Sequence, residues 1–182
     1  ERADIYYNLG NVYKSLNKYQ DALKYYKTAL QKKPDFVVTY NNIGTVYEAL
    51  EDYDEAINMY QKGLKIDPNN PKLHYNLGIV FDNKNDFESA AKSYKRATEI
   101  NPNLIEAYNN LGIIYEKIGK YDEAIDYFND ALTIDSNHLK ANNNLGLIYE
   151  NLKDYPKAEN QYKEALRIDS NYLLAKKNLG RT

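Results

Sequence analysis

The feature that most constrains the fold is a period of 34 residues that continues without interruption along the chain. The run Tyr40-Asn41-Asn42-Ile43-Gly44 recurs as His74-Tyr75-Asn76-Leu77-Gly78 and again around Gly10, Gly112 and Gly146. The copies divide the sequence into repeats 3–36, 37–70, 71–104, 105–138 and 139–172, followed by a partial repeat or capping helix at 173–182. A period of this length predicts an array in which each repeat packs on its neighbours.

Each repeat contains two amphipathic patterns. Apolar or small residues recur at i, i+3, i+4 and i+7 in the first half, as over 40–47, and a similar stripe follows in the second half, as over 22–30. Both spacings are typical of an α-helix with one buried face. Short polar turns such as Glu51-Asp52 separate the halves, and Pro34, Pro68 and Pro102 end the second half. The sequence therefore predicts an all-α fold with two helices in each repeat.

A glycine occupies position 8 of every full repeat, inside the first predicted helix (Gly10, Gly44, Gly78, Gly112 and Gly146). Glycine in a helix costs about 1 kcal/mol relative to alanine, so a packing reason is required. We expect close helix contact there, with the glycine facing the small residues at positions 20 and 27 and aromatic residues filling the remaining space. Most of the 20 tyrosines are then core residues.

The combination of Leu-Gly-x-x-Tyr, Tyr-x-x-Ala and the closing proline resembles the tetratricopeptide-repeat family over essentially the whole chain. The resemblance implies a right-handed α-solenoid of antiparallel helix pairs whose first helices line a concave groove, where partners usually bind. It implies a protein-interaction scaffold for a protein or an extended peptide. Residues 173–182 fit either a natural capping helix or a repeat that has been cut.

Composition argues against several other classes of protein. The 24 Lys and Arg nearly balance the 26 Asp and Glu, so no basic surface for nucleic acid is expected. The chain has no cysteine and no apolar run long enough to span a membrane, and we expect an intracellular, cytoplasmic protein. No phosphate-binding loop, metal-ligand cluster or converging acid pair is apparent, so we expect no enzyme activity, cofactor or metal. The oligomeric state is left open.

Asparagine stands at position 6 of every copy, on the side of the first helix that we expect to face the groove (Asn8, Asn42, Asn76, Asn110, Asn144 and Asn178). Asparagine is a mediocre helix former, so its presence there needs another reason. Its amide can both donate to and accept from a peptide group. We predict a ladder that binds the backbone of an extended peptide. The alternative is that duplication copied an asparagine of no function.

Two further positions give the predicted groove its character. Position 9 is apolar at Ile79, Ile113 and Leu147, and position 12 is acidic at Glu48, Asp82, Glu116 and Glu150. Such a surface favours a partner that carries lysine or arginine beside apolar residues. The alternative for the acidic row is a solvated helix face.

Two alternatives to a stand-alone adaptor come from resemblance. The asparagine ladder is similar to the repeat array of O-linked N-acetylglucosamine transferase, which implies a substrate-recognition arm of such an enzyme. The carboxylate clamp of co-chaperones is matched at Asn11, Asn42 and Lys72, but Tyr7 and Asn76 stand where the clamp has cations. The clamp is the weaker of the two alternatives.

Overall fold

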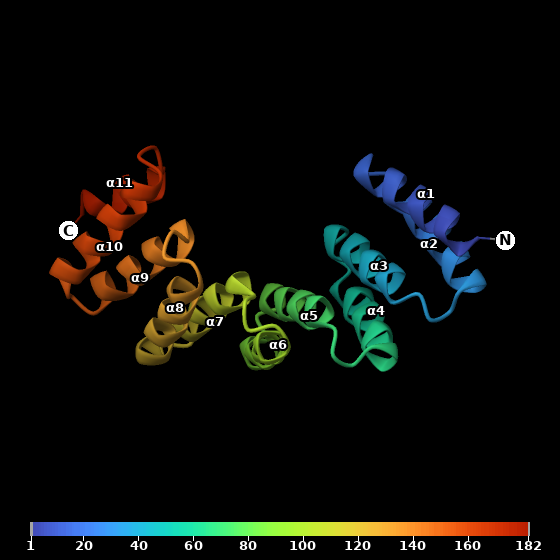
Figure 1. The fold of residues 1–182 in the computed structure, drawn as a ribbon, viewed down its shortest axis with the longest axis horizontal. Coiled ribbons are helices and arrows are strands. Elements are labelled where there is room, and N and C mark those ends of the chain that lie inside the picture. The colour runs from blue at the N-terminus through green and yellow to red at the C-terminus, as the bar shows by residue number, and fades with distance from the viewer. Residues whose placement is uncertain (1, 182) are drawn as a thin grey trace. The chain divides into compact units, whose positions relative to one another are not determined.

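The computed structural model describes residues 2–181, and all regular secondary structure in this part of the chain is α-helical, in eleven helices (Figure 1). The predicted all-α class is confirmed. The first helices of the repeats are α1 (Ala3–Ser15), α3 (Val37–Ala49), α5 (Pro71–Asn83), α7 (Ile105–Lys117), α9 (Leu139–Asn151) and α11 (Leu173–Leu179). The second helices are α2 (Tyr19–Lys32), α4 (Tyr53–Ile66), α6 (Phe87–Ile100), α8 (Tyr121–Ile134) and α10 (Tyr155–Ile168).

The chain forms two compact units, Glu1–Ser93 and Tyr94–Thr182, and the boundary falls within α6. The N-terminal unit contains α1 to α5, and the C-terminal unit contains α7 to α11. Within a repeat α1 packs on α2, α3 on α4, α7 on α8 and α9 on α10, and between repeats α2 packs on α3, α4 on α5, α8 on α9 and α10 on α11. Contacts between first helices of successive repeats are few.

The turn between the two helices of a repeat uses the left-handed backbone region. Position 15 has φ between 56° and 62° at Asn17, Glu51, Asn85 and Lys153, and φ 76° at Gly119. A residue in this region lets the chain reverse direction at the end of a helix. The next helix then begins at a polar cap, as where Asp52 and Asp154 accept hydrogen bonds from backbone N–H groups.

The close approach of the two helices within a repeat comes from a glycine that faces an aromatic ring. A Cβ atom on Gly44 would lie 2.3 Å from the ring of Tyr60, and one on Gly112 would lie 2.5 Å from the ring of Phe128. Gly10 and Gly146 face Tyr26 and Tyr162 in the same way. The predicted close approach is present, but its predicted partner was wrong: position 8 meets the large residue at position 24. A buried ring needs the space that a missing Cβ leaves.

Small and large residues are matched where a second helix meets the next first helix. A Cβ on Gly63 would lie 2.8 Å from Leu73, the largest residue found at position 3 after the first repeat. The corresponding pair in the C-terminal unit is Ala131 with Ala141, and both belong to one buried cluster with Phe128. The large side chain of Leu73 on α5 therefore fills the space left by the missing side chain of Gly63 on α4.

Candidate functional site

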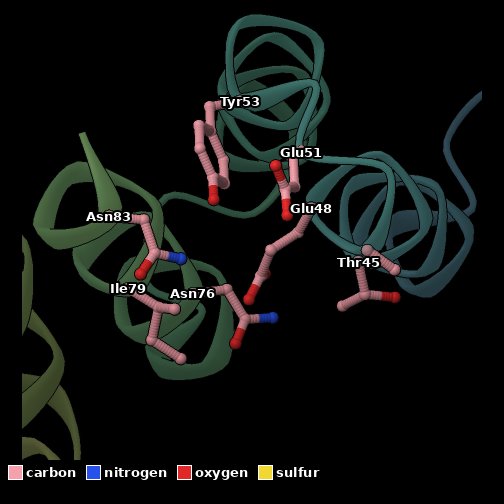
Figure 2. Close-up of a pocket in the computed structure, with 8 residues that line it drawn as sticks. Thr45, Glu48, Glu51, Tyr53, Asn76, Ile79 and Asn83 are labelled. Atoms are coloured by element: carbon pink, nitrogen blue, oxygen red, sulfur yellow. The ribbon is translucent and has the colours of Figure 1, made fainter.

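A pocket of about 370 Å³ opens between α3 and α5 in the N-terminal unit. Three side chains of the predicted groove, Glu48, Asn76 and Ile79, line it together (Figure 2). The remaining lining residues are Thr45, Ala49, Glu51, Tyr53 and Asn83. Figure 2 shows the side chains of Glu48 and Asn76 extending into the same space from neighbouring helices. Positions 6, 9 and 12 meet here because successive first helices lie side by side.

Glu48 is held at the edge of this pocket by the core. Tyr60 donates its hydroxyl hydrogen to Oε2 of Glu48 at 3.1 Å. Burial raises the pKa of Glu48, whereas the hydrogen bond from Tyr60 and the charge of Lys14 oppose the rise. The pKa of Tyr60 is raised in turn by burial and by the neighbouring carboxylate. Glu48 is thus a half-buried, oriented acceptor, unlike the fully solvated residue of the alternative interpretation.

A lysine from the preceding repeat approaches the same pocket. Lys14 on α1 donates to Oγ1 of Thr45 at 2.6 Å, which brings its ammonium group close to the α3 side of the pocket. Burial is the main cause that lowers the pKa of Lys14, and the charge of Lys72 lowers it further. Thr45 also donates to the backbone carbonyl of Asn42 at 2.9 Å.

The acidic row in the C-terminal unit has two different environments. Glu150 accepts hydrogen bonds from Tyr162 at 2.7 Å and from Arg181 at 3.2 Å. Glu116 is half-buried, and Phe128 occupies the position from which a tyrosine hydroxyl would reach it. Burial raises the pKa of Glu116, and the charge of Lys117 only partly offsets the rise. Asp82 in the N-terminal unit is also half-buried.

The asparagines at position 6 mostly bond to the preceding repeat instead of standing free. Asn76 donates to Oδ1 of Asn41 at 2.8 Å, and Asn42 donates to Asn11 at 2.8 Å and to Tyr7 at 3.2 Å. They were predicted to lie open on the groove face, whereas Asn76 is only 8% exposed. In the N-terminal unit only Asn8 is exposed. The side chain leaves the helix at an angle that reaches the neighbouring first helix.

The C-terminal unit repeats this arrangement. Asn144 donates to Oδ1 of Asn109 at 3.2 Å, and Asn178, which is 5% exposed, donates to Oδ1 of Asn143 at 3.1 Å. Asn110 donates to the hydroxyl of Tyr94 at 3.3 Å. The acceptors at position 5 were not predicted as functional residues. Their recurrence as asparagine at three of the first helices, Asn41, Asn109 and Asn143, was the available signal.

The apolar residues of position 9 were predicted to line the groove, opposite the buried seam of each first helix. Ile79, Ile113 and Leu147 are all half-buried on first helices. Ile79 lies in the α3–α5 pocket, and Ile113 packs against the buried cluster around Phe128. Within residues 2–181 no group of three or more His, Asp or Glu side chains is placed to hold a metal ion. The described helices are too short or too polar to cross a membrane.

Sequence comparison identifies the repeats. The family model described as Tetratricopeptide repeat matches residues 3–36, 105–138 and 139–172. A second, described as TPR repeat, matches residues 49–84 and 83–119. No curated protein sequence matches the chain significantly.

Several solved structures have the same fold. The crystal structure of YrrB, described as a TPR protein with an unusual peptide-binding site, is 31% identical, with a TM-score of 0.77. The match covers 94% of this chain and 89% of that one. The crystal structure of MamA protein is 25% identical over 92% of each chain, with a TM-score of 0.82. MamA from Desulfovibrio magneticus RS-1, at 20% identity, covers 94% of this chain and 97% of its own, with a TM-score of 0.84. This chain belongs to the tetratricopeptide-repeat family.

Proposed function

We propose that the protein is an interaction scaffold that binds an extended segment of a partner protein along its first helices. The observation that carries this proposal is the convergence of Glu48, Asn76 and Ile79 on one pocket of about 370 Å³ between α3 and α5. The 31% identical YrrB, whose structure is described as having a peptide-binding site, supports the same kind of ligand.

The chemistry of the pocket fits a lysine or arginine side chain of the bound segment. Ile79 and Ala49 offer apolar contact to the methylene groups of such a side chain. Glu48 and Glu51 supply carboxylates for the charged end. Tyr60 occupies only Oε2 of Glu48, so Oε1 is available as an acceptor. Asn83 is exposed at the rim and can bond to the backbone of the segment.

The asparagine ladder serves this function by positioning the first helices. The Asn76 amide holds α5 to α3 through Asn41, and it thereby sets the width of the pocket that both helices line. Asn42 holds α3 to α1 in the same way. A ladder that is bonded between repeats supports the binding surface by holding the helices that form it.

Selection from a displayed library of random nine-residue peptides, followed by fluorescence anisotropy, tests the proposal. Peptides selected on the native chain should be enriched in lysine or arginine, and Ile79→Lys or Glu48→Gln should weaken their binding at least tenfold. Glu88→Gln, an exposed carboxylate on α6, is the matched control and should bind normally. Selected peptides whose affinity changes with neither pocket variant would refute the proposal.

The two alternatives have less support from the geometry. A carboxylate clamp needs the amide hydrogens of Asn42, which donate to Tyr7 and Asn11. The likeness to the O-linked N-acetylglucosamine transferase array depended on asparagines that face the ligand, whereas Asn76 and Asn178 are buried. A co-chaperone would bind an acidic peptide ending in Glu-Glu-Val-Asp, and Lys72→Ala would abolish that binding. We expect this chain to show no such Lys72-dependent binding.

A further inference from the structure

The α9–α11 pair of the C-terminal unit holds an arginine side chain between two acceptors. Nη2 of Arg181 donates to Oε2 of Glu150 at 3.2 Å and to Oδ1 of Asn178 at 2.9 Å. Glu150 is at position 12 of one repeat, and Asn178 and Arg181 are at positions 6 and 9 of the next. One terminal nitrogen of a guanidinium group thus bridges an acidic and an amide side chain from successive first helices. Glu48 and Asn76, at the same two positions, line the α3–α5 pocket.

The acidic acceptor has the same setting in both pairs of helices. Tyr162 donates to Oε2 of Glu150 at 2.7 Å. Tyr60 donates to the same atom of Glu48 at 3.1 Å. A carboxylate oxygen has two lone pairs, and Oε2 of Glu150 accepts from Arg181 in addition to the tyrosine. The tyrosine bond to Glu48 therefore leaves that carboxylate able to accept from a guanidinium group.

The amide acceptor is also oriented alike in the two pairs. Nδ2 of Asn178 donates to Oδ1 of Asn143 at 3.1 Å, and Oδ1 of Asn178 accepts from Arg181. Nδ2 of Asn76 donates to Oδ1 of Asn41 at 2.8 Å. In the described part of the chain Oδ1 of Asn76 accepts no hydrogen bond. Although most of the Asn76 side chain is buried, it lines the pocket, so this oxygen is within reach of a bound side chain.

Position 9 is the difference between the two sites. The counterpart of Arg181 in the α3–α5 pocket is Ile79, whose side chain has neither a charge nor a donor. Lys14 on α1 donates to Oγ1 of Thr45 at 2.6 Å. No lysine or arginine in the described part of the chain forms an ion pair with Glu48. The α3–α5 pocket therefore has both acceptors of the arginine site and no cation of the chain between them.

We propose that the α3–α5 pocket selects arginine over lysine in the bound segment, with the arginine held as Arg181 is held in the α9–α11 pair. This inference rests on the proposed function, which leaves the choice between the two cations open. Nη2 of the bound arginine would donate to Glu48 and Asn76, and its other nitrogens would donate to the exposed carboxylate of Glu51 on the same pocket (Figure 2). The five donors of a guanidinium group are spread over three nitrogens in one plane. A lysine ammonium carries its three donors on a single, more strongly hydrated nitrogen.

The test uses the strongest-binding nine-residue peptide from the displayed library. Its pocket-binding cation is the residue whose replacement by alanine removes the effect of Glu48→Gln on affinity. The peptide is then synthesised with arginine, lysine or symmetric dimethylarginine at that residue and measured by fluorescence anisotropy. Arginine should bind at least fivefold more tightly than lysine. Symmetric dimethylarginine should also bind at least fivefold more weakly than arginine, because it keeps the charge but leaves one hydrogen on each terminal nitrogen.

A pair of variants measures the same preference without a peptide. Ile79→Arg places an arginine at position 9, as Arg181 is placed in the α9–α11 pair, and Ile79→Lys places the same charge on an ammonium group. Carbon-13 NMR titration should show that Ile79→Arg lowers the pKa of Glu48 further than Ile79→Lys does. Circular dichroism checks that both variants are folded.

The outcomes separate this inference from the proposed function. Equal affinities of the arginine and lysine peptides, both weakened by Glu48→Gln, would overturn the selectivity and leave the proposed function standing. Equal pKa values of Glu48 in the two Ile79 variants would count against the selectivity in the same way. Selected peptides whose affinity does not change with either Glu48→Gln or Ile79→Lys would overturn the proposed function, and the selectivity with it.

Discussion

At the scale of single residues, one buried hydroxyl stands out. Thr39 is fully buried, and its Oγ1 has no hydrogen-bond partner. A buried polar atom without a partner costs roughly 1–3 kcal/mol. Thr39→Val keeps the shape and should raise the free energy of unfolding by about 1 kcal/mol in urea titrations. Thr98→Val is the control, because Thr98 is buried but donates to the Lys95 carbonyl at 2.8 Å, and this variant should not gain stability.

The asparagine ladder should contribute to stability. Asn76→Ala removes the donor to Asn41, which is itself 6% exposed, and should lower the free energy of unfolding by roughly 1–3 kcal/mol. Asn8→Ala changes the same repeat position where the side chain is exposed, and should stay within about 0.5 kcal/mol of the native value. Equal effects of the two variants would show that the inter-repeat bond contributes nothing.

Glu116 should make stability depend on pH. Burial raises its pKa in the folded state above that of the unfolded chain, so the folded protein holds this proton more tightly. The contribution of protonated Glu116 to stability is fully present below its pKa in the unfolded chain. It is lost as pH rises through its pKa in the folded protein. The free energy of unfolding of Glu116→Gln, relative to that of the native protein, should therefore increase as pH rises from 4 to 7.

Phe128→Tyr provides an independent test of the same site. The added hydroxyl should donate to Glu116 as Tyr60 donates to Glu48, lower the pKa of Glu116, and stabilise the folded state by about 0.5–1.5 kcal/mol at pH 7. Carbon-13 NMR titration of the carboxyl group reads the pKa directly. An unchanged pKa would mean that the tyrosine–glutamate geometry of the second and fifth repeats is not transferable.

At the scale of helices, the turn at position 15 decides how each pair reverses. Lys153 adopts φ 62°, which strains a side-chain-bearing residue by about 1–2 kcal/mol, whereas Gly119 accepts φ 76° without that cost. Glycine loses more backbone entropy on folding, which offsets part of this relief. Lys153→Gly should still raise the free energy of unfolding, measured by thermal or urea unfolding, by about 0.5–1 kcal/mol. Gly119→Ala should lower the free energy of unfolding, because alanine is strained at φ 76° even though no atom lies within 4 Å of the new Cβ.

At the scale of the whole molecule, each helix contacts mainly its immediate neighbours. Removal of residues 139–182 should leave 1–138 folded, with lower stability and a smaller dependence of unfolding free energy on urea. The control is a fragment ending at residue 120, in which α7 has lost α8. Because α7 lacks its partner there, this fragment should have a lower helix content per residue, measured by circular dichroism, than fragment 1–138. Complete unfolding of 1–138 would contradict a modular core.

The repeat, the helix pairs and the tight contact at the glycines were all predictable from the sequence. These features follow from local periodicity, because residues three and four apart share a helix face whatever lies beyond it. The same periodicity placed Ile79, Ile113 and Leu147 on the face predicted to line the groove, whereas in the structure all three are half-buried and Ile113 packs against the cluster around Phe128.

Which neighbour each helix face meets depends on the packing of successive repeats, and the sequence did not predict it. Asn76 was expected to face a ligand because it lies opposite the seam of its own helix, but the preceding first helix lies close enough to bury it. Gly44 was expected to face alanine, and it faces Tyr60, whose hydroxyl then orients Glu48. A single-helix projection contains neither the distance nor the crossing angle of the next helix, and these two quantities determine whether a side chain meets solvent, a ligand or another repeat.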